Sequence, residues 1–317
     1  MARREELKGK VAIVTGASSG VGWRSAVRLA QAGVRLCVTA RRREALEALQ
    51  KVVVDAGGEC LVVPGDVTDE MDVRWVVSAC LQRYGRIDIL VNDAAVRTHG
   101  DVDTSPGEHL QRTMDVARPG FLRFVHAVLP QFRAQGSGHI LNLQSMLSEG
   151  AAPRLSADTA AKHGPLGWAK ALKRELHGTG IEVSNVLVPS VATPMFDDAP
   201  TQPGHEPVPP TSDVDRVARA VVRCARRPGR TERPAFLQGT LLWLAPAVGN
   251  FVMGRYGARM RRAPEPLERS DGVGAYGSVP PTPRWKRFTA VMGLAALAGG
   301  LLGGAALGAR GLARGVR

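Results

Sequence analysis

The sequence predicts a doubly wound α/β domain, in which helices cover both faces of a parallel sheet. Six short apolar runs rich in β-branched residues recur between residues 11 and 188, and amphipathic stretches of helix length separate them. A glycine-rich turn, GASSGVG, follows the first run directly. Right-handed crossovers place helices over both faces of a parallel sheet, so its strands become apolar along their whole length.

The expected elements alternate regularly along the chain. The predicted strands are residues 11–15, 35–40, 60–65, 87–92, 138–143 and 181–188. The segments 42–56, 69–84 and 106–134 are expected to form helices between them. After Pro194 this order gives way to DDAPTQPGHEPVPPTSD, a proline-rich loop of the kind that often covers a site, and a helix is expected to resume near Asp213.

The chain is long enough for one large α/β core with appendages. Four parts are expected: an α/β domain over 1–240, a lid or membrane-surface segment over 241–262, a Pro/Gly-rich linker over 263–284, and an apolar helix with basic flanks over 285–317. The start of the chain, MARREELKGK, lacks the apolar stretch of a secretory signal. We therefore expect the α/β domain to be cytoplasmic.

The C-terminal part predicts association with a membrane. Residues 288–309 carry no charge and would form a helix about 33 Å long, enough for a hydrocarbon core of roughly 30 Å. Gly300, Gly304 and Gly308 recur at four-residue spacing, which lets helices approach closely in lipid. The alternatives are a Gly/Ala-rich tail outside the membrane and a helix packed on its own protein. The basic residues on both flanks leave the orientation open.

The net charge indicates which kind of large partner is expected, and the cysteines indicate whether metal sites or disulfides are expected. The net charge is +13, and most of this excess lies in residues 255–317. The arginines there flank apolar segments with little aromatic interleaving, which favours an anionic membrane surface over nucleic acid. The four cysteines are scattered singly, so neither a metal site nor a disulfide framework is indicated.

The glycine turn predicts a dinucleotide site. Gly16, Gly20 and Gly22 stand between the first strand and the start of the following helix. A dinucleotide pyrophosphate needs close backbone approach without Cβ atoms, together with helix N–H groups aimed at its charge. This arrangement is typical of a Rossmann-type fold.

The stretch TGASSGVG resembles the TGxxxGxG motif of the short-chain dehydrogenase/reductase family, and the likeness extends over residues 8–238. GDVTD is similar to the family's adenine-contacting segment, and VNDAA stands where the family usually has NNAG, with Asp93 and Ala95 as departures. Ser190 replaces the usual glycine near the nicotinamide. The cofactor-binding residues that the resemblance implies are Gly16, Ser18, Ser19, Gly20, Val21, Gly22, Asp66, Val67, Asn92, Lys162, Pro189 and Thr193.

The end of the second strand indicates which dinucleotide is bound. This segment reads VTARRRE, and no carboxylate between Leu36 and Arg43 can accept hydrogen bonds from an adenosine ribose. Arg41 and Arg42 can instead hold a 2′-phosphate through charge-assisted hydrogen bonds. NADP(H) is therefore the expected cofactor. The alternative is that these arginines form a solvated start of a helix.

The resemblance implies a catalytic site in which hydride moves between the nicotinamide and a carbonyl or alcohol carbon. The family uses a tyrosine as proton donor, a lysine four residues later, a serine thirteen residues before it, and an asparagine on the preceding helix. Ser145 and Lys162 are in place, but Asp158 occupies the tyrosine position and Ala117 the asparagine position. Asp158 is also shorter than tyrosine, and a carboxyl one helical turn from an ammonium is expected to be ionised.

Two interpretations of the site remain open. Asp158 is either a replaced catalytic residue or an ordinary helix-surface partner of Lys162. His163 should point about 100 degrees away from Lys162 around the helix, and His139 begins a strand far from Ser145, so neither is a strong candidate acid. No metal is implied.

The chain is accordingly expected to be a membrane-associated NADP(H)-binding protein whose usual oxidoreductase activity is lost or reduced. The alternative is an active NADP(H)-dependent oxidoreductase that uses a water or another group as proton donor. The substrate, a small molecule in either case, is not indicated by the sequence. The resemblance also implies a homo-oligomer formed through 106–134 and 155–178.

Overall fold

The fold is that of a computed structural model, in which residues 6–94, 120–151, 155–191, 193 and 212–234 are described. The chain divides into two units, Met1–Phe236 and Leu237–Arg317, and all described residues belong to the first. The predicted lid, linker and apolar C-terminal helix lie outside the described residues. Within the described ranges, no helix combines the length and apolarity needed to cross a membrane.

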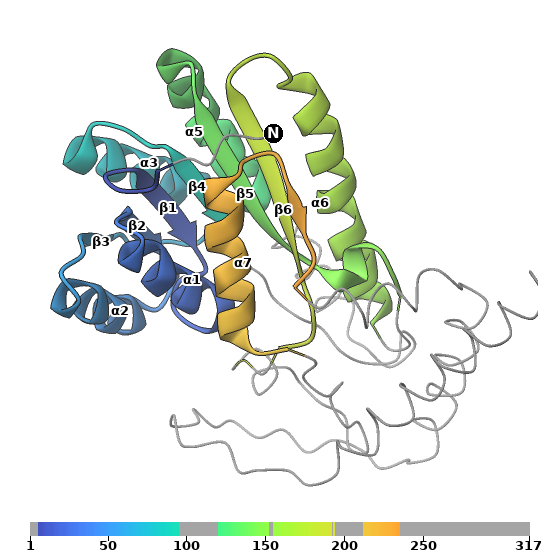
Figure 1. The fold of residues 1–317 in the computed structure, drawn as a ribbon, viewed down its shortest axis with the longest axis horizontal. Coiled ribbons are helices and arrows are strands. Elements are labelled where there is room, and N and C mark those ends of the chain that lie inside the picture. The colour runs from blue at the N-terminus through green and yellow to red at the C-terminus, as the bar shows by residue number, and fades with distance from the viewer. Residues whose placement is uncertain (1–5, 95–119, 152–154, 192, 194–211, 235–317) are drawn as a thin grey trace, which may run out of the picture. The chain divides into compact units, whose positions relative to one another are not determined.

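The sequence prediction of a parallel sheet is confirmed (Figure 1). Its spatial order is β3-β2-β1-β4-β5-β6-β7, and every strand pair is parallel. The strands are β1 (Val11–Thr15), β2 (Arg35–Thr39), β3 (Cys60–Val62), β4 (Ile89–Asn92), β5 (Gly138–Ser145), β6 (Ile181–Val188) and β7 (Thr231–Glu232). From β1 the chain adds strands β2 and β3 on one side and then β4 to β7 on the other, so the direction of strand order changes between β1 and β4. Doubly wound sheets bind ligands at such a switch point.

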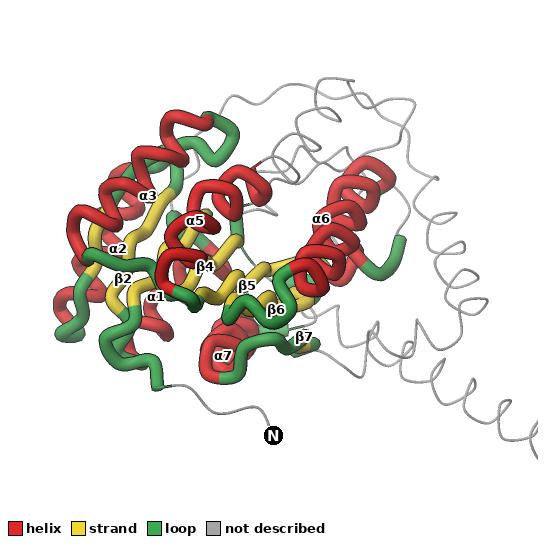
Figure 2. The backbone as a smooth tube through the Cα atoms, turned by 90° about the horizontal axis from the view of Figure 1, so that it is seen from above, coloured by secondary structure: helices red, strands yellow, loops and turns green. Residues whose placement is uncertain are grey.

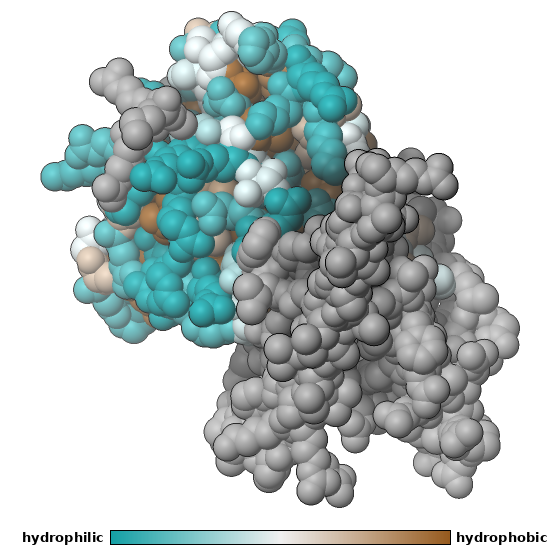
Figure 3. Space-filling view, turned by 45° about the vertical axis from the view of Figure 1, so that its right-hand side comes forward, coloured by the Kyte–Doolittle hydropathy of each residue, from teal (hydrophilic) through white to brown (hydrophobic). Residues whose placement is uncertain are grey.

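Helices cover both faces of this sheet, as Figure 2 shows. They are α1 (Gly20–Gln31), α2 (Arg43–Asp55), α3 (Glu70–Tyr84), α5 (Phe121–Gln135), α6 (Ser156–Glu175) and α7 (Val214–Arg226), with a short 3₁₀ helix at Met146–Ser148. One hydrophobic cluster joins the sheet to α1, α2 and α7, and a second joins its other face to α3, α5 and α6. On the face seen in Figure 3, the described residues are mainly hydrophilic, with smaller hydrophobic areas between them.

Local chemistry fixes the ends of individual helices. Asp69 precedes α3 and accepts hydrogen bonds from the N–H groups of Met71 and Asp72, which lack partners within the helix. Gly85 ends the same helix with a φ of 73°, a left-handed conformation that suits glycine. The position of α3 is therefore set by the residues next to it in sequence.

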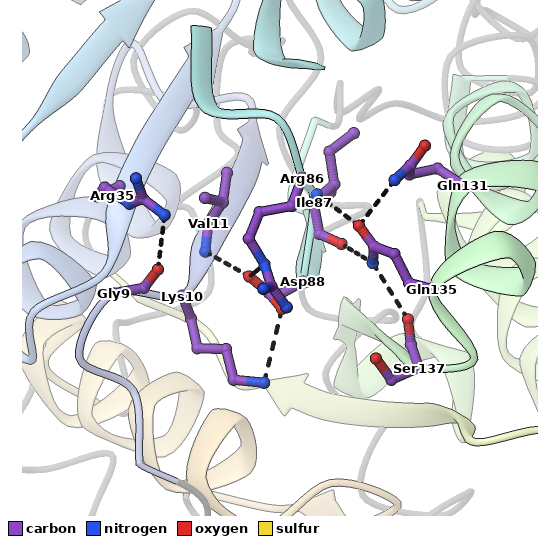
Figure 4. Close-up of polar contacts among 10 residues, drawn as sticks. All are labelled: Gly9, Lys10, Val11, Arg35, Arg86, Ile87, Asp88, Gln131, Gln135 and Ser137. Atoms are coloured by element: carbon purple, nitrogen blue, oxygen red, sulfur yellow. Dashed lines mark hydrogen bonds and ion pairs between the residues drawn. The ribbon is translucent and has the colours of Figure 1, made fainter. Parts of the chain in front are cut away.

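A buried carboxylate organises the edge of the sheet where β1 and β4 begin (Figure 4). The Asp88 side chain is 4% exposed, accepts the Val11 N–H at 2.8 Å and pairs with Arg86 and Lys10. The Gln135 side chain at the end of α5 is bonded to both the N–H and the C=O of the neighbouring Ile87. These contacts lie at the amino ends of the strands. They do not occupy the carboxyl ends, where a ligand site is expected.

Helix α7 is fastened to α1 by one acidic side chain. Asp215 accepts hydrogen bonds from Arg24 at 2.7 Å and from Arg28 at 2.8 and 2.7 Å, and it also pairs with Arg219. The hydrogen bond from Arg28 is the main cause that lowers the pKa of Asp215 below its usual range. The α1 helix, which begins at the glycine turn, is thereby held on its outer side.

Candidate functional site

The glycine turn packs directly against the end of β4. Gly16 and Gly20 have φ values of 69° and 58°, which disfavour residues with a side chain. A Cβ atom on Gly16 would lie 2.8 Å from the Ala94 nitrogen, and one on Gly22 would lie 2.5 Å from the Gly16 oxygen. A Cβ on Gly20 would meet Thr193 at 3.1 Å, so two of the predicted cofactor residues are close neighbours. The chain path therefore requires the glycines that the motif supplies.

Thr15, which sequence reasoning did not single out, holds this arrangement together. Its hydroxyl accepts hydrogen bonds from the N–H groups of Asp93 at 3.1 Å and Ala94 at 3.2 Å, and donates weakly to the Val91 oxygen at 3.5 Å. The last residue of β1 thus fixes the segment that leaves β4. The signal in the sequence was a hydroxyl residue directly before the glycine turn.

A pocket opens at the carboxyl ends of β1, β4 and β5, with about 410 Å³ of space that includes open solvent. Its lining consists of Thr15, Val67, Asn92, Ala94, Gly120, Phe121, Leu143, Gln144, Lys162 and Pro165. Three predicted site residues, Val67, Asn92 and Lys162, are thereby brought together from segments far apart in the sequence. Ser145 and Asp158 do not line this pocket.

A row of asparagines supports the floor of the pocket. Asn92, Asn142 and Asn185 lie in register on β4, β5 and β6, and all three are buried. The Asn92 amide donates to Asn142 at 3.3 Å, and the Asn142 amide donates to Asn185 at 3.3 Å. Buried amides need such partners. The row fixes the orientation of Asn92 and gives the retained asparagine of VNDAA a physical role.

Gln144 is a second residue that the sequence analysis missed. It is 4% exposed and lines the pocket, and its Nε2 atom has no hydrogen-bond partner among the described residues. A buried donor without a partner is costly, by about 1–3 kcal/mol, which makes Gln144 a candidate contact for a bound ligand. Alternation along β5 separates its direction from that of Ser145. The Ser145 hydroxyl accepts the Leu147 N–H at 3.1 Å and caps the 3₁₀ helix.

Helix α6 carries the positions of the predicted lysine and of the replaced tyrosine. Asp158 lies in its first turn and is only 4% exposed, so it is not an ordinary surface residue. The interpretation of a helix-surface pair is therefore not supported. Ala117 and Ala95 lie outside the described residues.

The two histidines are placed away from the pocket. His163 is exposed, and its Nδ1 atom lies 2.9 Å from the Thr159 oxygen of the same helix. His139 stands at the amino end of β5 and its Nε2 atom lies 2.8 Å from the Ser184 hydroxyl. Burial is the largest cause that lowers the pKa of His139 to about 3, so this ring is neutral at physiological pH. Neither histidine is placed to protonate a ligand in the pocket.

The region predicted for the adenosine half contains an arginine in contact with the glycine turn. Arg42 donates hydrogen bonds to the hydroxyls of Ser18 at 3.1 Å and Ser19 at 2.9 Å. Arg41 is exposed beside it. The Asp66 carboxylate accepts from the N–H and hydroxyl of Thr68, so it shapes its own turn, while Val67 reaches the pocket. Pro189 is buried directly after β6.

Comparison with known proteins agrees with this geometry. Residues 10–204 match the family model described as short chain dehydrogenase. An uncharacterized oxidoreductase of Staphylococcus haemolyticus is 32% identical over 69% of this chain and 94% of its own length. A fatty acyl-CoA reductase of Acinetobacter baylyi is 30% identical over 79% of this chain and 85% of its own.

The chain is also similar in fold to solved structures of reductases and oxidoreductases. A 3-ketoacyl-(acyl-carrier-protein) reductase from Brucella melitensis complexed with NADH has a TM-score of 0.63 at 26% identity, covering 72% of this chain and 97% of its own. A metagenomic short-chain oxidoreductase in complex with NADP has a TM-score of 0.62 at 27% identity, covering 72% and 96%. Both were solved with a nicotinamide dinucleotide.

Proposed function

Because the chain belongs to the short-chain dehydrogenase/reductase family, we propose that it binds NADP(H) at the glycine turn and has lost, or retains only weakly, the carbonyl/alcohol oxidoreductase activity typical of the family. The observation that carries the cofactor proposal is the position of Arg42 on the hydroxyls of Ser18 and Ser19. That contact brings a guanidinium from the end of β2 to the rim of the turn.

The described residues fit a nicotinamide dinucleotide. The segment from Gly16 to Gly22 has no room for side chains at either of these two glycines. It includes the start of helix α1, where backbone N–H groups favour a pyrophosphate. Arg42 with the two serine hydroxyls would hold a 2′-phosphate. When bound, the cofactor would supply hydride transfer at the pocket that Lys162 and Asn92 line. Related structures carry NADH in one case and NADP in another, so Arg42 is what favours NADP(H).

Titration of the purified protein with NADPH and NADH tests the cofactor proposal. NADPH should bind at least about tenfold more tightly, a difference of about 1.4 kcal/mol. Replacing Arg41 and Arg42 with Ala should remove most of that difference, because only NADPH carries the 2′-phosphate that these guanidinium groups would bind. Arg43→Ala is the control, since Arg43 pairs with Glu47 along α2. Equal affinities in the unmodified protein would contradict the 2′-phosphate site, and binding of neither dinucleotide would contradict the cofactor proposal itself.

The loss of ordinary catalysis is inferred from the tyrosine position. Asp158 is buried, does not line the pocket and has a short side chain, so it is poorly suited to protonate a substrate oxygen there. General acid–base catalysis contributes typically about 10²- to 10⁴-fold to a rate. An active oxidoreductase that uses a water or another group remains the second candidate, because Lys162 and the unpartnered Gln144 amide still line the pocket.

Membrane association is proposed from the sequence of the C-terminal part. The uncharged residues 288–309 and their basic flanks favour insertion over electrostatic attachment. The full chain should sediment with membranes and resist extraction by high salt and by carbonate, whereas deletion after Pro283 should release the α/β domain. Release of the full chain by salt alone would contradict insertion, because salt screens electrostatic attachment but does not weaken burial in lipid.

A further inference from the structure

A carboxylic acid lies directly beneath the glycine turn. The main chain of Asp93 is held by Thr15, and its carboxyl group lies beside the main chain of Gly22. A Cβ atom on Gly22 would lie 2.6 Å from Asp93 Oδ2 and 2.5 Å from the Gly16 oxygen. Both oxygen atoms therefore lie close to the Gly22 main chain. The family usually has an asparagine at this position. The aspartate therefore places a titratable group where the family has a neutral amide.

The surroundings of Asp93 oppose its negative charge. Burial is the largest cause that raises the pKa of its carboxyl to about 8, while the Gly22 N–H and the charge of Lys162 act in the other direction. Among the described residues, β1 presents the Thr15 hydroxyl, α1 presents the Gly22 N–H, and α6 presents Lys162. Arg24, two residues after Gly22 in α1, is bound to Asp215.

We propose that dinucleotide binding by this chain is coupled to protonation of Asp93, so that the neutral carboxyl is the form that accepts the cofactor. This inference rests on the dinucleotide site proposed above. A pyrophosphate at the start of α1 would lie at the same end of the helix as the Asp93 carboxylate, which is beside Gly22. Two negative groups there repel each other, whereas a protonated carboxyl adds no charge and can donate a hydrogen bond, as an asparagine amide does.

The direction of the pH effect follows from this arrangement. A bound pyrophosphate raises the pKa of Asp93 above its value of about 8 in the free protein, because it adds negative charge nearby. Binding therefore takes up a proton at alkaline pH. The affinity should be nearly constant below this pKa and should fall by up to about tenfold for each pH unit above it.

Affinity measurements across this range test the coupling. NADPH and NADH are titrated into the full chain from about pH 7 to about pH 9, above the second ionisation of a phosphate near roughly 6. The unmodified protein should lose about tenfold in affinity for both dinucleotides, and Asp93→Asn less than about twofold. Asp55→Asn, the same change at an exposed residue paired with Lys51, should behave like the unmodified protein. Calorimetry of the unmodified protein in buffers of different ionisation enthalpy should show proton uptake near the alkaline end.

The outcomes separate this inference from the proposed function. A pH-independent affinity without proton uptake in the unmodified protein would overturn the coupling and leave dinucleotide binding intact. An equal loss of affinity in the unmodified protein and in Asp93→Asn would assign the proton to another group and also overturn it. Failure of both dinucleotides to bind at any pH would instead overturn the site on which the coupling rests.

Discussion

Replacing Asp158 with Tyr and Ala117 with Asn together should raise NADPH-dependent reduction of simple carbonyl compounds by about 10²- to 10⁴-fold. Ser145 and Lys162 are already present at the family's positions, so the proton donor and its asparagine relay are the missing groups. An ammonium one helical turn away should lower the pKa of the introduced phenol, which suits a general acid. The measurement is NADPH consumption with a panel of aldehydes, ketones and quinones.

Three controls accompany this experiment. Removing the Ser145 hydroxyl by Ser145→Ala in the double variant should abolish the gain, which separates a restored site from a general effect on folding. Thermal unfolding should be compared, because Asp158 is buried and a larger side chain costs typically about 1–3 kcal/mol where no space exists. Brisk activity of the unmodified protein that falls in Asp158→Asn would show that the carboxyl is catalytic and that the proposed loss of activity is wrong.

Gly22→Ala should weaken NADPH binding by roughly 5- to 150-fold and lower the free energy of unfolding by about 1–3 kcal/mol. The added Cβ would lie 2.5 Å from the Gly16 oxygen and 2.6 Å from Asp93 Oδ2, so the turn would have to move away from its present path. Isothermal titration gives the affinity and urea denaturation gives the free energy of unfolding.

Gly167→Ala is the matched control, because Gly167 lies within helix α6 and a Cβ there would meet nothing within 4 Å. Alanine in an open helical position should raise the free energy of unfolding by roughly 0.5–1 kcal/mol and leave binding unchanged. Unaltered NADPH affinity in Gly22→Ala would show that the turn does not form the cofactor cradle.

The class of fold and the place of the glycine turn can be predicted from local patterns in the sequence. Continuous apolar strands and the motif GASSGVG are local patterns, and each strand or turn is specified by the residues within it. The six predicted strands are all present, with shifts at their ends. The strand expected over 87–92 begins at Ile89, although the Asp88 main chain is already hydrogen-bonded to Val11 and His139 on its two sides.

Some elements depended on contacts made at long range. The strand expected over 60–65 ends at Val62, two residues before a proline that has no N–H to donate to a sheet. The seventh strand, Thr231–Glu232, was not predicted because two residues carry no periodic pattern, and it exists through pairing with Asn185 and Val186. A strand of two residues forms only because a neighbouring strand supplies its hydrogen-bond partners.

The burial and charge of the site residues depend on how distant segments come together in the folded chain. From sequence, Asp158 was equally compatible with an exposed partner of Lys162, and Asp93 was one departure from a motif. Folding buries Asp158, turns Arg42 onto Ser18 and Ser19, and encloses the Asp93 carboxyl beside Gly22. Burial and pKa depend on groups brought together from distant segments, and those neighbours are not encoded in any short stretch of the chain.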